Sequence, residues 1–146
     1  MGIFKSKATP ESLNDFSKGT LGEHLGMRFT AVGEDFLEAT MPVESRTHQP
    51  MGLLHGGASV ALAETLGSGA ATLCVDAEKQ FCVGLEINAN HLKGVRSGLV
   101  KGTTRPIHIG KKTQVWEIKI VNEQNEMVCV SRITIAVLDK QKNEGR

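Results

Sequence analysis

Residues 49–75 are apolar or small almost throughout, and Glu64 is the one member of this stretch with a formal charge. An ionised carboxylate on a buried helix costs several kcal/mol unless it is paired or reached by water, so folding alone gives no reason to keep it. Glu64 could instead face solvent or pair with a distant arginine. We expect it to be catalytic, as a carboxylate that activates water or acts as a nucleophile.

The motif His55-Gly56-Gly57 opens the same predicted helix. Glycines leave backbone N–H groups bare at the positive end of the helix dipole, where a ligand oxygen can approach closely. The Gly56 N–H could therefore polarise a carbonyl and hold the oxyanion that develops during acyl transfer. A helix that begins with glycine and binds no ligand gives the same pattern. The motif therefore indicates a site only in combination with Glu64.

Spacing decides how these two groups can cooperate. Glu64 follows Gly56 by eight residues, which is about 12 Å along a helix axis. One acyl carbon cannot touch both groups on one helix, so we expect a dimer in which Gly56 of one subunit faces Glu64 of the other across a twofold axis. Ser68, one turn beyond Glu64, and the adjacent Thr65 could position water or substrate, although either hydroxyl could also be a plain surface group.

A second charge pattern predicts an anionic ligand. No acidic residue occurs between Glu86 and Glu117, whereas six basic residues do. Glycine and lysines at residues 107–113, with the similar segment 90–94, could together grip phosphates, although a solvated strand face is the alternative. Nucleic acid is a poorer explanation, because the chain has no tyrosine and its five phenylalanines and one tryptophan are scattered. A thioester of coenzyme A offers both an acyl carbonyl and a phosphorylated handle. The basic residues are Lys93, Arg96, Lys101, Arg105, Lys111 and Lys112.

The elements that must position these groups follow from periodicity. Apolar residues recur every three or four positions from Gly56 to Cys74, which predicts one long helix. Thr9-Pro10-Glu11 predicts the start of a short helix. Alternating and β-branched segments predict strands within residues 25–33, 35–43, 80–92, 97–109, 112–122 and 127–139. We therefore expect an α+β domain with a five- or six-stranded antiparallel sheet covering one central helix.

Bulk properties limit the class of protein. The 146 residues fit a single domain, and the formal net charge of +1 argues against a generally basic nucleic-acid binder. Three cysteines without CxxC spacing predict neither a metal site nor a disulfide scaffold, and no cofactor is needed to explain folding. The N-terminus lacks an apolar signal segment and no stretch predicts a membrane span, so we expect a cytoplasmic protein.

Three segments carry a resemblance to a known family. They read TMPVESRTHQPMGLLHGGASVALAETLGS, VGLEINANHLKGVRSG and PIHIGKKTQVWEI. This combination resembles the hotdog-fold acyl-CoA thioesterases, closest to the branch that contains 1,4-dihydroxy-2-naphthoyl-CoA thioesterase and the proofreading thioesterase of enterobactin synthesis. The resemblance covers residues 13–138 and implies a sheet wrapped around the central helix. It also implies dimers that join their sheets edge to edge, commonly assembled into a tetramer.

The same resemblance implies roles for individual residues. Glu64 would be the catalytic carboxylate and the Gly56 N–H would polarise the thioester. Gln49 and His55 match positions that orient the carbonyl or the attacking water, and Ser68 matches a nearby hydroxyl. Thr65 stands where the naphthoyl branch often has serine, so the exact substrate is left open. The implied coenzyme A contacts are Gly84, His91, Leu92, Lys93, Gly94, His108, Ile109, Gly110, Lys111, Lys112 and Thr113.

Several alternatives stay open at this stage. A hydrolase of acyl carrier protein thioesters would share every feature above. A non-catalytic acyl-CoA sensor would keep the pocket but has no use for Glu64. A hotdog dehydratase would carry a proline-glycine pair at the helix entry, which residues 55–64 lack. The other large hotdog branch depends on a tyrosine-rich motif, and this chain contains no tyrosine.

Overall fold

The long helix α3 (Gly56–Leu73) lies at the centre of the fold in the computed structural model, which describes residues 2–142. Its small residues allow the helix to approach the sheet closely. A Cβ atom added at Gly67 would lie 2.5 Å from Ile133 Cγ2, and one added at Gly102 would lie 2.6 Å from Leu66 Cδ1. Glycine at these two positions therefore brings the sheet and the helix into direct contact.

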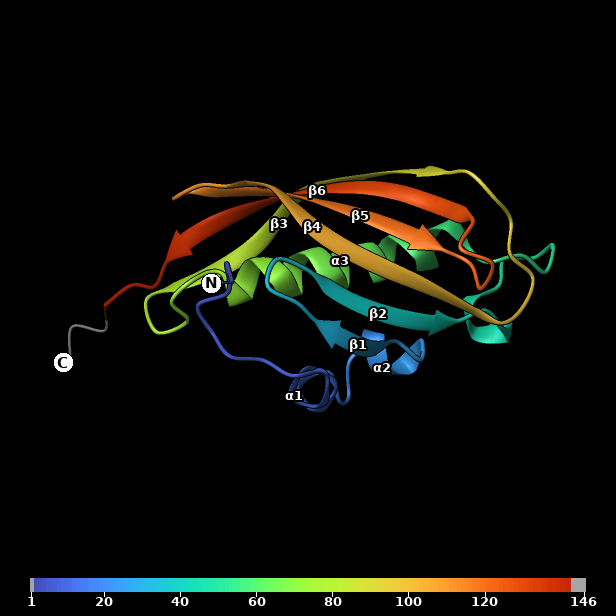
Figure 1. Cartoon of the computed structure of the whole chain (residues 1–146), viewed down its shortest axis with the longest axis horizontal. Helices are drawn as coiled ribbons and strands as arrows, with labels where there is room; N and C mark the ends of the chain where they lie inside the picture. The colour runs from blue at the N-terminus through green and yellow to red at the C-terminus, as the bar shows by residue number, and fades with distance from the viewer. Residues whose placement is uncertain (1, 143–146) are drawn as a thin grey trace.

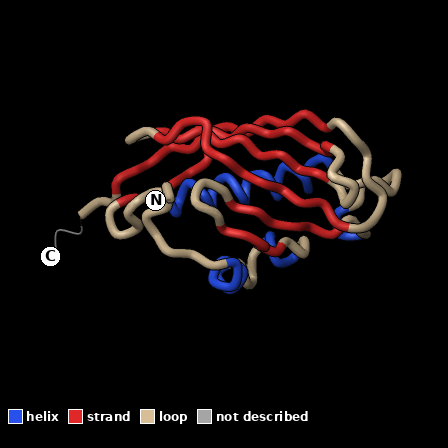
Figure 2. The backbone as a smooth tube through the Cα atoms, viewed as in Figure 1, coloured by secondary structure: helices blue, strands red, loops and turns tan. Residues whose placement is uncertain are grey.

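Six antiparallel strands form one sheet in the order β1-β2-β4-β5-β6-β3. Figure 1 shows this sheet curling around α3, so that strands lie on more than one side of the helix, and Figure 2 shows the same wrap as a backbone tube. The expected α+β hotdog architecture is confirmed, with six strands. The strands are β1 (Arg28–Val32), β2 (Leu37–Pro42), β3 (Gln80–His91), β4 (Leu99–Ile109), β5 (Thr113–Val121) and β6 (Met127–Asp139).

The core forms where the concave sheet face meets α3. Along β5 the alternation predicted from the sequence is confirmed, because Trp116, Ile118 and Ile120 are fully buried. Leu62 and Leu66 of α3 are also fully buried within the same cluster. Burial of this apolar surface is the main force that holds the helix in the curve of the sheet.

Three short helical segments complete the described chain. Helix α1 (Pro10–Phe16) begins at the predicted N-cap, and Thr9 and Ser12 form a reciprocal capping box. The α-helix α2 (Leu21–His24) and the 3-10 helix η1 (Ser45–Thr47) are not predicted from the sequence. Each is a single turn, too short to produce a hydrophobic period.

The two edges of the sheet differ. At β1 the side chain of Asn14 accepts a hydrogen bond from the Phe29 N–H (2.8 Å) and donates one to the Phe29 carbonyl (3.0 Å). The Asn14 amide therefore bonds the N–H and the carbonyl of Phe29 in the way that the backbone of a neighbouring strand would. At the other edge, β3 is paired on one side only, with β6, within residues 2–142. Its outer side therefore presents a long row of backbone groups.

Candidate active site

The N-terminal end of α3 presents one unoccupied backbone donor. His55 is the N-cap, and its Nδ1 atom accepts a hydrogen bond from the Gly57 N–H at 2.7 Å. The expectation of several bare N–H groups is therefore wrong for Gly57, because its neighbour's imidazole takes that donor. Within the described chain the Gly56 N–H has no acceptor. Since His55 Nδ1 acts as an acceptor, Nε2 is the nitrogen of this imidazole that is left to donate.

A cavity of about 380 Å³ opens beside this helix end. His91, at the end of β3, lies directly against Gly56, because a Cβ atom on Gly56 would sit 2.9 Å from His91 Nε2. A side chain at position 56 would therefore press against the imidazole of His91. Of the predicted site residues, this cavity brings together Gln49, Gly56, His91, Leu92, Lys93 and Gly94.

Four further residues line this cavity and were not predicted from the sequence: Leu53, Leu54, Ser59 and Val128. Leu53 and Leu54 close a small hairpin in which the Gln49 N–H donates to the Leu53 carbonyl at 2.8 Å. The two adjacent leucines just before the start of α3 could have indicated an apolar wall at this point of the sequence. Ser59 follows Gly56 by three residues, a spacing that puts both on one helix face. Val128 comes from a distant strand and left no local signal.

Gln49 is held by its own loop. Its side-chain oxygen accepts a hydrogen bond from the Met51 N–H, and its backbone carbonyl accepts one from the Gly52 N–H at 2.9 Å. These bonds use the acceptor end of the amide and leave its NH2 group as a donor. Gln49 can therefore donate a hydrogen bond in the cavity that it lines with Gly56, whereas His55, the residue before Gly56, does not line that cavity.

Glu64 is exposed, so the expectation of a buried carboxylate is wrong for the single chain. The side chain lies over Gly84 of β3, where an added Cβ atom would be 3.1 Å from Glu64 Oε1. Here α3 runs beneath the open edge of the sheet, which explains how a carboxylate on an otherwise apolar helix avoids the cost of burial.

The two hydroxyls near Glu64 differ in their bonding. Thr65 donates to the Ala61 carbonyl of the preceding turn at 2.7 Å, which uses its proton within the helix. Ser68 is half-buried, and its hydroxyl makes no hydrogen bond to any residue in the described range. Ser68 is thus the freer of the two hydroxyls.

One chain does not unite these groups. Gly56 and Glu64 lie on the same uninterrupted helix, eight residues and about 12 Å apart along its axis. The cavity at Gly56 contains neither Glu64 nor Ser68. Within one chain, Gly56 and Glu64 are therefore too far apart to act on the same acyl carbon, as the sequence predicted.

The two predicted phosphate-binding segments also lie apart within one chain. Thr113 pairs with Ala136, and Ala136 pairs with Val83, so the β4–β5 turn is level with Val83 on β3. His91 lies eight residues further along β3, at about 3.3 Å per residue, or roughly 26 Å away. Residues 90–94 and 107–113 therefore do not meet within one chain, because they lie at opposite ends of the sheet.

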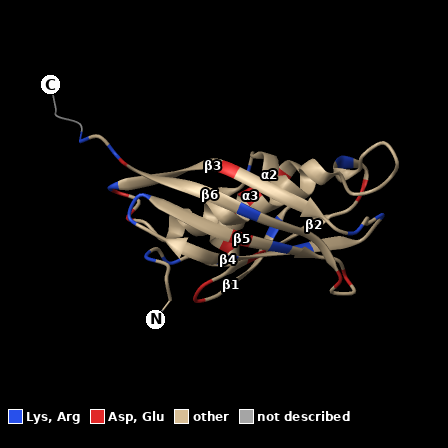
Figure 3. Cartoon of the chain, turned by 90° about the horizontal axis from the view of Figure 1, so that it is seen from above, with Lys and Arg blue, Asp and Glu red and all other residues tan. Residues whose placement is uncertain are grey.

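Half of the six basic residues in the acid-free stretch are paired. Lys93 contacts Glu126 (2.5 Å), Lys101 contacts Glu38 (3.7 Å) and Arg105 contacts Asp35 (2.6 Å). Figure 3 shows basic segments interspersed with acidic ones along the molecule. Lys93 lowers the pKa of Glu126 by a hydrogen bond between their side chains. Lys111 and Lys112 form no ion pair within residues 2–142.

The β4–β5 turn borders a larger cavity of about 950 Å³ at the C-terminal end of α3. Among the predicted contacts, Ile109, Gly110, Lys111 and Lys112 line it. His108 lies over the turn, because a Cβ atom on Gly110 would be 2.6 Å from His108 Nε2. Thr113 closes the turn by accepting the Gly110 N–H at 2.8 Å.

The described residues offer neither a cluster of metal ligands nor a membrane-spanning helix. No group of three or more His, Cys, Asp or Glu residues in that part of the chain could hold a metal ion. None of the described helices combines the length and apolar character needed to cross a bilayer.

Comparison with known proteins gives consistent matches. The Thioesterase superfamily model matches residues 51–129. The chain is 52% identical to 1,4-dihydroxy-2-naphthoyl-CoA hydrolase of Escherichia coli, covering 93% of this chain and 99% of that protein. It is 54% identical to the proofreading thioesterase EntH of Cronobacter turicensis, over 93% of this chain and 98% of that one.

Solved structures of thioesterases have the same fold as this chain. A mutant thioesterase from Pseudomonas aeruginosa superposes with a TM-score of 0.94 at 49% identity, covering 95% of this chain and 100% of its own. A thioesterase from Haemophilus influenzae gives a TM-score of 0.93, also at 49% identity, with coverage of 98% and 99%.

Proposed function

The chain belongs to the thioesterase superfamily and hydrolyses thioesters, and we propose that its substrate is an aromatic or related acyl-CoA. The family resemblance expected from the sequence is confirmed. The name of the Escherichia coli relative makes 1,4-dihydroxy-2-naphthoyl-CoA the first acyl group to test. The products would be the free acid and coenzyme A.

The observation that carries this proposal is the donor cluster at Gly56. A backbone N–H without an acceptor in the described chain begins α3, and His55 and Gln49 offer further donors beside it. Donors aimed at a carbonyl oxygen stabilise the oxyanion that forms when the thioester carbon is attacked. The adjoining cavity, walled by Leu53, Leu54 and Val128, suits an apolar portion of a ligand.

The catalytic carboxylate would come from a second subunit. If Gly56 of one subunit faces Glu64 of the partner subunit, then His91 of the first faces Gly84 of the partner, because each lies against its neighbour on α3. Two β3 strands would then run antiparallel about an axis midway between residues 84 and 91. The open edge of β3 supports this arrangement, since a dimer would complete its hydrogen bonds. A dimer of such dimers is the proposed full assembly.

In this site Glu64 acts on the carbonyl carbon that Gly56 polarises. As a general base it removes a proton from water, the hydroxide adds to the carbon, and the C–S bond breaks as the oxyanion collapses. As a nucleophile it adds to the carbon, the C–S bond breaks as the oxyanion collapses to a mixed anhydride, and water then hydrolyses the anhydride. In the general-base route the proton that Glu64 takes from water passes to the departing thiolate, whereas in the nucleophile route the thiolate leaves before water enters and takes its proton from solvent. Ser68, one turn beyond Glu64, would hold the water.

The same twofold axis would reunite the phosphate-binding segments. The β4–β5 turn is level with Val83, which in the proposed dimer faces residue 92 of the other subunit. Lys111 and Lys112 of one subunit would then lie near Leu92 and Lys93 of its partner. The phosphate-binding residues would then come from both chains, with Lys111, Lys112 and Glu64 from one chain and residues 90–94 and the carbonyl donors from the other.

The free thiols support a cytoplasmic location. Cys74, Cys82 and Cys129 form no disulfide, and Cys74 and Cys129 are buried. Burial raises the pKa of the Cys74 thiol to about 11. Such unpaired thiols are usual in a reducing compartment.

A panel of acyl-CoA thioesters tests the proposal, with thiol release measured and kcat/KM determined for each. Aromatic acyl-CoAs should give the highest values. The same acyl group attached to the phosphopantetheine of an acyl carrier protein should be assayed beside each acyl-CoA, because it distinguishes the two substrate classes. Higher kcat/KM for the carrier-protein thioester than for every acyl-CoA would overturn the proposed substrate class, and no thiol release from any of them would overturn the chemistry.

A further inference from the structure

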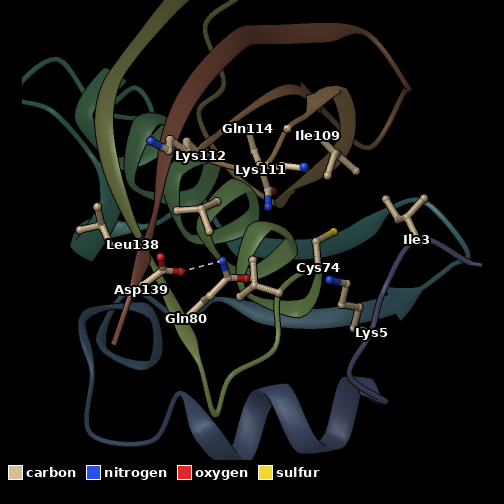
Figure 4. A pocket seen from close by; sticks show the side chains of 13 residues that line it. Ile3, Lys5, Cys74, Gln80, Ile109, Lys111, Lys112, Gln114, Leu138 and Asp139 are labelled. Carbon is tan, nitrogen blue, oxygen red and sulfur yellow. Dashed lines mark hydrogen bonds between the residues drawn. The ribbon is translucent and has the colours of Figure 1, made fainter. Parts of the chain in front are cut away.

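The large cavity at the C-terminal end of α3 receives residues from several separate parts of the chain. Figure 4 shows the β4–β5 turn supplying Lys111 and Lys112, the ends of β3 and β6 supplying Gln80 and Asp139, and the N-terminal arm, residues 2–9, supplying Ile3 and Lys5. The arm lies outside residues 51–129, the segment that the superfamily model matches. The sequence patterns did not single out Ile3 or Lys5 as site residues.

The arm is held firmly against the fold. The Ile3 N–H donates to the Glu34 carbonyl at 2.9 Å, and the N–H groups of Lys5 and Ser6 donate to the Leu73 carbonyl at 2.8 and 3.2 Å. The Phe4 ring stacks on buried Trp116 with 6.5 Å between ring centroids. These contacts on both sides of Lys5 fix its backbone at the cavity wall.

The charges of the cavity favour an anion. Three lysines, Lys5, Lys111 and Lys112, face one carboxylate, that of Asp139, which accepts a hydrogen bond from the Gln80 amide at 3.1 Å. A helix C-terminus is the negative end of the dipole and would repel an anion. Here the Leu73 carbonyl is satisfied by two N–H groups of the arm, so the arm weakens that repulsion as well as adding a cation.

The cavity also lies at a suitable distance from the reacting atoms. Leu73 follows Glu64 by nine residues on α3, about 14 Å along the axis. The pantetheine arm of coenzyme A separates the thioester from the nucleotide phosphates by a comparable length. A volume of about 950 Å³ is ample for a nucleotide.

We propose that Lys5 is a third phosphate-binding residue, which contacts the nucleotide of coenzyme A together with Lys111 and Lys112. This inference rests on the proposed acyl-CoA substrate. It makes the N-terminal arm a specificity element, because a thioester on a carrier protein has the phosphopantetheine but not the nucleotide. Lys5 would therefore favour acyl-CoA over carrier-protein thioesters without touching the reacting carbon.

Binding of adenosine 3′,5′-bisphosphate, measured by calorimetry, tests the contact without any turnover. Lys5→Ala should weaken this binding by about tenfold, the usual loss for one hydrogen bond to a charged group. Lys5→Arg keeps the charge and should retain most of the affinity. The control is Lys7→Ala, which removes an exposed lysine of the same arm that does not line the cavity. Equal affinities for wild type, Lys5→Ala and Lys7→Ala would overturn the proposal.

Kinetics separate this proposal from the proposed function. Lys5→Ala should raise KM for acyl-CoA about tenfold with kcat within twofold, and should leave KM for acyl phosphopantetheine unchanged. A rise in KM for both substrates alike would overturn the nucleotide contact. If the wild type released no thiol from any substrate, the proposed function would fail, while the calorimetric comparison would still decide whether Lys5 binds the nucleotide.

Discussion

The two edges of the sheet differ in how the backbone groups on their outer sides are bonded. β1 has five residues, and Asn14 hydrogen-bonds both backbone groups of Phe29 on its outer side. β3 has twelve residues and keeps its outer side unpaired in the described chain. Side chains there are also apolar and uncovered, since Val83 is 39% and Leu85 61% exposed.

Only the open edge carries site residues. Gly84 of β3 lies under Glu64, and His91 of β3 lies against Gly56. An unpaired strand of this length invites association, so a fold retains one where a partner is needed. In the proposed dimer the closed edge would serve stability alone, whereas the open edge would serve assembly and, through it, catalysis.

The largest effect is expected from Glu64→Gln at the open edge. The substitution keeps the size of the side chain but removes its basicity and most of its nucleophilicity, so kcat should fall by about 10²-fold or more. KM should change little, and the free energy of unfolding should stay near that of the wild type, because the carboxylate is exposed in the single chain. Steady-state kinetics and urea denaturation measure these quantities.

The control for this variant is Glu78→Gln, which alters an exposed carboxylate in the loop after α3. Its turnover should match the wild type. Near wild-type turnover of Glu64→Gln would remove Glu64 from the chemistry.

A smaller effect is expected when Lys111 and Lys112 are both replaced with alanine. KM for acyl-CoA should rise about tenfold or more while kcat changes little, because the lysines would hold the handle and not the reacting carbon. Added salt should raise the wild-type KM in the same direction by screening. Lys18→Ala on the closed-edge side, where Lys18 pairs with Asp15, is the control. A salt series in which the double variant keeps the wild-type KM would count against the phosphate site.

The smallest effect is expected from Asn14→Ala at the closed edge. The change removes both hydrogen bonds to Phe29, which should lower the free energy of unfolding by about 1 kcal/mol and leave kcat/KM unchanged. Asn14→Asp keeps an acceptor for the Phe29 N–H and should lose less. Urea denaturation and the thiol-release assay give both numbers. If Asn14→Ala lowered kcat/KM while the free energy of unfolding stayed at the wild-type value, the closed edge would also contribute to catalysis, which contradicts the proposed division.

Much of this fold could be predicted because its signals are local. The alternation around Trp116 and Ile118 and the spacing of apolar residues in α3 gave the strands and the helix. The distance between Gly56 and Glu64 needed only helix geometry. These features depend on neighbours in sequence, which the sequence displays directly.

Other features depend on neighbours in space. Apolar residues surround Glu64 on all sides of α3, so periodicity could not show that its face lies under a sheet edge. Arg105 appeared free in the sequence because its partner, Asp35, is 70 residues away. The place of Lys5 depends on where residues 2–9 cross the end of α3. None of these contacts leaves a pattern along the chain.

The central claim is that Gly56 and Glu64 work together from different subunits, and exchange of inactive subunits tests it. Gly56→Pro removes the N–H at the first helical position, where proline is tolerated, and His55 has a ψ of 129° that suits a following proline. Gly56→Ala adds a Cβ atom against His91 but keeps the N–H, and is the matched control for that donor.

Glu64→Gln and Gly56→Pro subunits should be mixed in equal amounts, exchanged by mild denaturation and refolding, and assayed for thiol release. Each mixed dimer would contain one intact site, so random exchange should restore about one quarter of the wild-type rate, far above either variant alone. A refolded mixture no faster than its two components would contradict the shared site.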